Sequence, residues 1–425
     1  MKNPFANTFF RDGAIAGVAN LLTNVGSFVF YSAAAHALGP STGGLFLALV
    51  AAALLTSMLA NIAGVALTPE IARFRAADDR GGVRAHATRA ALGWLGSSFV
   101  LGLLALALAR PGEALFHLDD PLLLLETAAV VSANALLFLT RAFVQAIARF
   151  DVYAASNLIE TGLKFASAFM ILRSPSLRLT IGVLAGVLAF AAVATAWPIV
   201  AYVRRAVGAA RLSRDERNAA GSLIAAFSAL AVMTFADGII ARNLLPPFDA
   251  GLYNAAALAG RALMSALSFV PLVVLAKMPL AKGADRGDRM FYAAVVACCL
   301  AAIAIFARFP AFILIAVGGQ AFLTGAPLVA LYGIAASALA MSNLVVSYRL
   351  SRGARTIGRV LVAIAAAEVV AMLVYHPNAV ALVTVLIAGH SAAFIASCIT
   401  GSRVQFARSS RERQTGESSL GSSIT

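Results

Sequence analysis

Residues 38–46 read LGPSTGGLF, and residues 247–253 read PFDAGLY. Each segment places a proline four residues before a glycine that is followed by leucine and an aromatic residue, and the two are 207 residues apart. A second pair repeats at nearly the same distance: EALF at 113–116 precedes Pro121, and QAFL at 320–323 precedes Pro327. Ordered matches at one spacing indicate an internal duplication. The sequence therefore predicts two related halves.

The composition decides the environment of these halves. Hydrophobic residues make up 61% of the 425 residues and charged residues 12%, and the mean hydropathy is +0.87. A soluble chain carries about 25% charged residues. The apolar residues here form long blocks, many of them near the roughly 20 residues that a helix needs to cross a bilayer. This pattern predicts an all-α polytopic membrane protein and excludes a soluble enzyme.

Twelve apolar spans are expected along the chain. They are 13–36, 45–67, 91–109, 121–140, 154–172, 179–201, 220–241, 251–275, 291–317, 326–348, 360–375 and 379–399. Six spans per half give both halves the same orientation, so a pseudo-two-fold axis would run along the membrane normal with a cavity between the halves. Arg308 and Pro310 predict a kink or an early end in the ninth span.

The same reading gives the domain boundaries. We expect an N-terminal tail at 1–12, a first six-helix half at 13–201, a connecting loop at 202–219 and a second half at 220–399. Residues 400–425 are polar, with too little apolar surface to fold, and are expected to form a disordered tail.

The net charge of +14 is distributed unevenly. The tails and alternate loops carry 26 of the 33 Lys and Arg residues, whereas the connections on the other side carry four. Lys and Arg remain on the cytoplasmic side of membrane proteins. Both termini are therefore expected in the cytoplasm, and the basic character predicts no nucleic-acid partner.

Several classes of chemistry have no signal in the sequence. The three cysteines form no CxxC pair or Cys/His cluster, so neither a metal site nor a disulfide framework is indicated. The chain has no GxxxxGK[ST], HExxH or GxSxG motif. The outer connections are too short for a catalytic domain. We therefore expect a protein that is not an enzyme and has no cofactor.

The quoted turns also carry a family resemblance. The turn at 38–46, its repeat at 249–253, the link at 141–150 and the turn at 319–327 resemble the polysaccharide transporter, or O-antigen flippase, branch of the multidrug/oligosaccharidyl-lipid/polysaccharide (MOP) flippase superfamily. The resemblance covers about 14–399 and implies twelve spans with both ends inside. It implies a lipid-linked oligosaccharide as substrate in the bacterial inner membrane, with membrane lipids and polysaccharide polymerase or ligase machinery as partners.

Charged residues inside the spans need a reason, because a charge at the bilayer centre costs about 2.5–3.5 kcal/mol on insertion scales. Glu160 and Lys164 are four residues apart on one helix face, so they form either a structural pair or a cavity group. Arg261 has no acid one turn away, so it must pair with another helix, with Asp237 as the candidate, or face water. Lys164 and Arg261 are the predicted contacts for an anionic substrate.

Other polar residues of the spans complete the candidates. Asn20 and Asn24 form a polar stripe on the first span and Asn61 lies on the second, where asparagines serve as cavity groups or as helix–helix contacts. Asp237, Glu160 and Glu368 are candidates for binding a coupling ion.

The resemblance implies a flippase that moves an undecaprenyl-pyrophosphate-linked oligosaccharide by alternating access, and the cations Lys164 and Arg261 are compatible with such a substrate. One alternative is an ion-coupled multidrug or metabolite antiporter of the same superfamily. A second is a membrane-embedded glycan transferase or polymerase.

Overall fold

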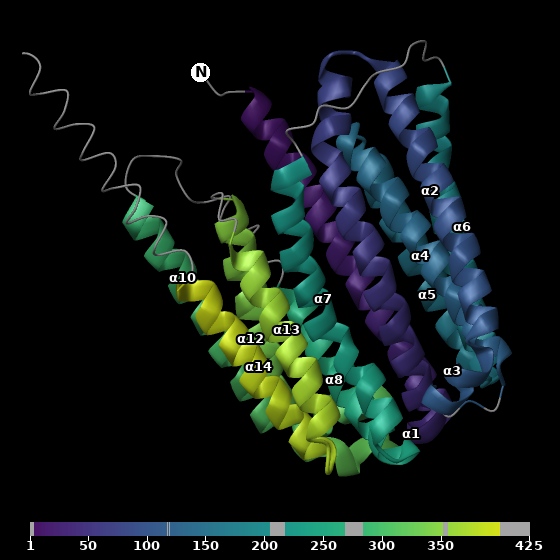
Figure 1. The fold of residues 1–425 in the computed structure, drawn as a ribbon, viewed down its shortest axis with the longest axis vertical. Helices are drawn as coiled ribbons and strands as arrows, with labels where there is room; N and C mark the ends of the chain where they lie inside the picture. The colour runs from purple at the N-terminus through teal and green to yellow at the C-terminus, as the bar shows by residue number, and fades with distance from the viewer. Residues whose placement is uncertain are drawn as a thin grey trace, which may run out of the picture.

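The computed structural model describes residues 4–116, 118, 120–204, 217–267, 284–351 and 356–399. These residues form helices and connections without any strand (Figure 1). The helices are α1 (Pro4–Ala76), α2 (Arg80–Ala107), α3 (Ala109–Phe116), α4 (Leu122–Ala146), α5 (Phe150–Arg173), α6 (Leu177–Val203), α7 (Arg217–Leu244), α8 (Pro247–Leu267), α10 (Ala284–Arg308), α11 (Pro310–Gly318), the 3₁₀ helix η1 (Gln320–Gly325), α12 (Ala326–Ser351), α13 (Ile357–Val374) and α14 (Ala379–Ile399). The predicted all-α polytopic membrane protein is confirmed.

Helices lie at all twelve predicted spans within the described residues. Eight stretches are long and apolar enough to cross a membrane, or nine if the bent pair α10 and α11 counts as one span. One of the eight, in α1, contains two predicted spans, because Gly39 breaks the helix with φ 72° and ψ 178°. That conformation is readily accessible only to glycine. The remaining two spans correspond to α5, which carries Glu160 and Lys164, and to α8, described to Leu267.

The ends of the predicted segments need adjustment. α1 begins at Pro4, so most of the expected N-terminal tail is helical. α4 continues to Ala146, beyond the predicted end at residue 140. The expected tail at 400–425 and most of the loop at 202–219 lie outside the described residues.

The duplication is visible in the order of the helices. In each half a long helix is followed by a short one, α2 by α3 and α10 by α11, and then by three long helices. The bend between α10 and α11 is 82°, and Pro310 begins the second helix of that pair. The predicted break of the ninth span near Arg308 and Pro310 is therefore confirmed.

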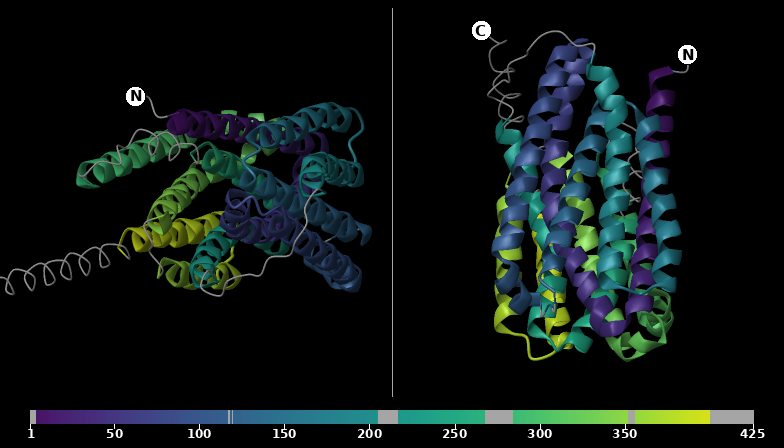
Figure 2. Two further views of the ribbon diagram at one scale, coloured as in Figure 1. Left: turned by 90° about the horizontal axis from the view of Figure 1, so that it is seen from above. Right: turned by 90° about the vertical axis from the view of Figure 1, so that its right-hand side faces the viewer.

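The two halves stand side by side, with α1–α6 and α7–α14 on opposite sides of Figure 1. Their helices lie close together at the lower end and spread toward the upper end (Figures 1 and 2). At the lower end the repeated turns meet: a Cβ atom built on Gly44 would lie 2.3 Å from the Cα atom of Gly251. Small residues allow helices to approach this closely in membranes. The glycines of the two turns therefore form a backbone contact between the halves.

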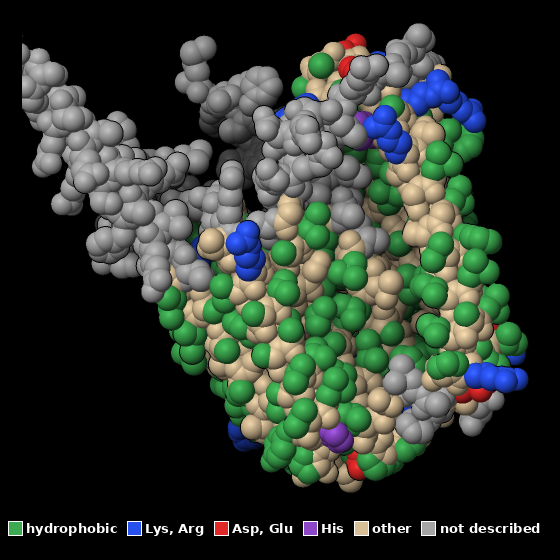
Figure 3. All heavy atoms as spheres, in the orientation of Figure 1, with side chains coloured by type: hydrophobic (Ala, Val, Ile, Leu, Met, Phe, Trp, Pro, Cys, Tyr) green, Lys and Arg blue, Asp and Glu red, His purple; other side chains and the backbone are tan. Residues whose placement is uncertain are grey.

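Apolar side chains cover the outside of the helices. In Figure 3 they occupy the middle of the visible face, while Lys and Arg side chains lie near its upper and lower ends. Large exposed side chains include Phe99 on α2 and Trp197 on α6, with exposed fractions of 69% and 70%. In a lipid environment these side chains need no protein partner, so the outer faces are suited to the bilayer.

Candidate functional site

A cavity of about 420 Å³ lies between the two halves. α1, α4, α5 and α6 line it from the first half, and α7 and α8 from the second. Its polar and charged lining side chains are Asn20, Thr23, Asn24, Ser27, Tyr31, Asn134, Arg141, Glu160, Lys164, Arg261 and Ser265. A volume of this order falls in the range of small-molecule sites, about 300–1,000 Å³.

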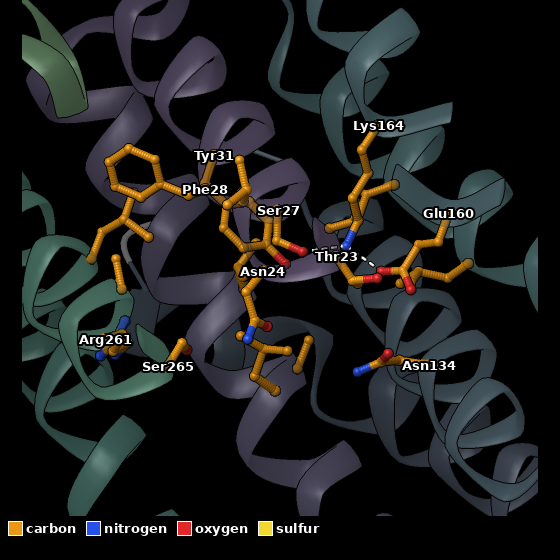
Figure 4. A pocket seen from close by; sticks show the side chains of 18 of the residues that line it. Thr23, Asn24, Ser27, Phe28, Tyr31, Asn134, Glu160, Lys164, Arg261 and Ser265 are labelled. Carbon is orange, nitrogen blue, oxygen red and sulfur yellow. Dashed lines mark hydrogen bonds and ion pairs between the residues drawn. The ribbon is translucent and has the colours of Figure 1, made fainter. Parts of the chain in front are cut away.

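Glu160 holds two cations on the first-half side of this cavity. One carboxylate oxygen accepts from Nζ of Lys164, one turn further along α5, and the other lies 2.8 Å from Nη2 of Arg141 on α4. All three side chains are buried. Lys164 also donates to the hydroxyl of Ser27 on α1 at 2.8 Å, as Figure 4 shows. The predicted Glu160–Lys164 pair is present, and it lines the cavity.

Arg141 was missed in the sequence because it was assigned to the loop after the fourth span. The longer α4 buries it instead, 8% exposed, where Nε donates to the hydroxyl of Ser156 at 3.1 Å. Ser156 in turn accepts from the hydroxyl of Thr195 on α6 at 2.6 Å. In the sequence, a cation directly after an apolar span can belong either to a loop or to the last turns of the helix. Only the position of Glu160 on the neighbouring helix distinguishes these two cases, and that position is known from the structure alone.

Arg261 lies on the opposite side of the cavity, on α8 (Figure 4). Its Nη2 atom is 2.9 Å from Oδ1 of Asp237 on α7, and Nε donates to the carbonyl of Thr234 at 3.0 Å. The predicted partner, Asp237, is thus the observed one. Asp237 is buried, and its other oxygen accepts from the hydroxyls of Tyr253 and Tyr332.

The remaining candidates divide between the cavity and other places. Asn20 and Asn24 line the cavity. Asn61 is not among the lining residues, and its amide contacts the sulfur of Met58 at 3.9 Å. Glu368 is also outside the cavity, buried beside His390 on α14.

The charge balance of the lining favours anions. Among the described lining residues, Arg141, Lys164 and Arg261 carry positive charge and Glu160 carries negative charge. Asp237 stands behind Arg261 and offsets part of this excess. Guanidinium and ammonium groups are strong donors to carboxylate or phosphate oxygens. Within the described residues no group of three His, Cys, Asp or Glu side chains could hold a metal ion.

Comparisons with known proteins identify the fold. No family model matches the sequence, and no curated protein matches it. Among solved structures, an inward-facing multidrug resistance MATE family transporter of the MOP superfamily is 14% identical, with a TM-score of 0.63 over 93% of this chain and 96% of that one. The lipid II flippase MurJ, in an inward closed conformation, is 12% identical, with a TM-score of 0.64 over 92% and 87% of the two chains.

A MOP superfamily transporter from Pyrococcus furiosus is also similar, with 12% identity and a TM-score of 0.58 over 94% of this chain and 96% of that one. The chain therefore has the fold of these MOP superfamily transporters, which is the fold that the resemblance in the sequence implies. The narrower resemblance to O-antigen flippases stays a prediction.

Proposed function

We propose that this protein translocates an undecaprenyl-pyrophosphate-linked oligosaccharide across the bacterial inner membrane by alternating access, with both termini in the cytoplasm. The supporting observation is the cavity between the halves, whose described lining has three cations and one carboxylate. An anionic, partly polar substrate suits such a site better than a cationic drug does. The fold shared with a lipid II flippase also supports this substrate class.

The lining offers a place for each part of such a substrate. Arg261 and Lys164 stand on opposite sides of the cavity and are the proposed contacts for pyrophosphate oxygens (Figure 4). Amide and hydroxyl groups of Asn24, Ser27 and Asn134 are available to a glycan. The polyprenyl chain would remain in the lipid around the apolar outer faces.

Alternating access would use the contact between the halves. The backbones of Gly44 and Gly251 touch, and the cavity lies further along the interface. In the proposed orientation this contact lies at the outer end, so the cavity would load from the cytoplasmic side. Release would require the two glycines to separate while the opposite ends of the halves approach one another.

A second candidate is an ion-coupled antiporter for drugs or metabolites. The similarity in fold to MATE family transporters supports it equally. The buried acids Asp237, Glu160 and Glu368 would then bind the coupling ion. The cation excess of the cavity favours an anionic cargo, which is why the flippase comes first.

A reconstituted assay tests the proposal. Purified protein would be placed in liposomes with a fluorescent undecaprenyl-pyrophosphate-linked saccharide, and flipping measured as the fraction that an impermeant reductant quenches. We expect flipping by the wild type and its loss in Arg261→Ala at equal reconstitution. Arg261→Lys should retain part of the activity, because the charge remains while the bidentate fork is lost. Asn61→Ala, outside the cavity, is the matched control.

Three other outcomes would contradict the flippase. Export of a cationic dye without flipping would favour the antiporter. Lengthening of the lipid-linked glycan, detected by mass spectrometry, would favour the transferase or polymerase. In cells, an unchanged distribution of lipid-linked intermediates between the two leaflets after deletion of the gene would also contradict it, whereas accumulation on the cytoplasmic leaflet is expected.

A further inference from the structure

A second buried polar cluster lies in the C-terminal half, outside the cavity. Glu368 on α13 and His390 on α14 have exposed fractions of 5% and 1%. Neither side chain is among the residues that line the cavity. Two titratable groups removed from both lipid and cavity need a structural or chemical reason.

The ring of His390 has an acceptor at each nitrogen. Nδ1 lies 2.9 Å from the carbonyl oxygen of Ala335, and Nε2 lies 3.2 Å from that of Met233. A neutral imidazole has one N–H group and can donate only one of these hydrogen bonds, whereas an imidazolium donates both. The neutral ring would instead place a nitrogen lone pair against a carbonyl oxygen. The surroundings therefore match the protonated ring.

Glu368 supplies the opposite charge. Its Oε1 atom is 3.6 Å from Nε2 of His390, which is an ion-pair distance and too long for a good hydrogen bond. Its Oε2 atom is buried and has no hydrogen-bond partner among the described residues. Gly389 makes room for that oxygen, since a Cβ atom there would lie 2.0 Å from it. In the described part of the chain, no Lys or Arg forms an ion pair with Glu368.

The cluster is connected to the cavity through two neighbouring helices. On α7, Met233 is one turn from Asp237, which binds Arg261 of the cavity wall. On α12, Ala335 is three residues from Tyr332, whose hydroxyl donates to Asp237. The titratable and charged groups packed around this region are therefore Glu368, Asp237, Tyr332, Tyr253 and Arg261. With His390 protonated, two carboxylates balance two cations.

We propose that His390 and Glu368 form a proton-binding site that is coupled to the substrate cavity through Asp237 and Arg261. Loss of the proton would leave this region with one uncompensated negative charge beside Asp237, which would hold Arg261 more firmly. A protonated site would release Arg261 more readily to an anion. The proton site itself is independent of the proposed function, whereas the coupling to the cavity rests on it.

Nitrogen-15 NMR of the full-length protein labelled at histidine tests the site directly. In the wild type at pH 7, we expect an imidazolium signal that disappears in His390→Gln. Glu368→Gln should convert this signal to that of a neutral ring, because the counter-charge is removed. The assignment to His390 rests on that loss, because the other histidines are unchanged in the variant. A neutral His390 in the folded wild type would overturn the proposal.

The coupling is tested with farnesyl pyrophosphate as an anionic probe. Binding to the purified protein should change the number of bound protons, measured with a pH indicator in weak buffer between pH 5.5 and 8. Glu368→Gln should bind the probe without that change. Binding to the wild type with no proton change across this range would refute the coupling. Failure of the probe to bind would count against the proposed function, while the NMR result would still decide the proton site.

Discussion

Glu160 and Glu368 occupy corresponding positions of the two halves, 208 residues apart, and have different surroundings. Glu160 is held by two basic side chains, Arg141 and Lys164, and it lines the cavity. Glu368 faces one histidine, a group that gains and loses its charge near neutral pH, and is closed off from the cavity. The two halves share a fold but differ at this position: the first half has a cluster of one acid and two basic side chains, and the second half has an acid paired with a histidine.

The arginines on the helices that precede these two acids, α4 and α12, also have different partners in the two halves. Arg141 and Arg349 are also 208 residues apart. The first reaches Glu160, whereas Nη2 of the second donates to the carbonyl oxygen of Cys398 at 2.6 Å. Corresponding positions in the two halves therefore do not determine which group an arginine binds. The neighbouring side chains determine the partner of the long guanidinium group.

The largest expected difference between the halves is in stability. Glu160→Gln leaves two buried cations without a counter-charge, and removing one partner of a buried ion pair costs about 3–5 kcal/mol. Glu368→Gln removes one weak partner of His390, so we expect a loss of about 1.5–3 kcal/mol. Unfolding free energies in mixed micelles, measured at pH 7 for both variants, check this. Equal losses would mean that the two acids are equivalent.

In contrast to Glu160 and Glu368, the glycines of the two repeated turns should contribute equally to stability. Alanine at Gly44 would bring Cβ to 2.3 Å from the Cα atom of Gly251, and alanine at Gly251 would bring it to 2.0 Å from the carbonyl oxygen of Pro40. Overpacking of this kind costs about 1–3 kcal/mol, and both variants should lose similar amounts. Gly93→Ala, with no atom within 4 Å of the added carbon, is the control. A loss confined to one of the two turns would contradict their equivalence.

The smallest difference concerns the paired arginines. Arg141→Leu removes the ion pair with Glu160 and the hydrogen bond to Ser156, and it should cost about 1.5–3 kcal/mol. Arg349→Leu removes a hydrogen bond to a neutral carbonyl and should cost about 0.5–1.5 kcal/mol. The same micelle titration measures both. A larger loss of unfolding free energy in Arg349→Leu than in Arg141→Leu would contradict the view that the stronger polar cluster lies in the first half.

The sequence was sufficient for most of the fold. Apolar spans of about 20 residues and the repeated turn at 38–46 predicted the twelve helical positions and the two halves. It was not sufficient for α3, because a helix of eight residues has no span-length signal. The site was predictable only in part: a charge inside a span is visible in the sequence, as for Arg261 and Lys164, while its partner on another helix is not. Arg141 was missed for this reason, and the participation of Tyr332 could not be anticipated.

The Gly44–Gly251 contact also bears on how such a chain can arise. Two copies of one turn touch each other at equivalent residues, which is the arrangement that defines an isologous contact in a two-fold dimer. A six-helix ancestor bearing this turn could have paired with a second copy of itself through the same glycine, in the same membrane orientation. Fusion of the two copies would then have preserved the interface while freeing each side to change its charges. On such a route the Gly44–Gly251 contact would be the trace of the dimer's two-fold symmetry, and the unlike surroundings of Glu160 and Glu368 would follow from the covalent linkage.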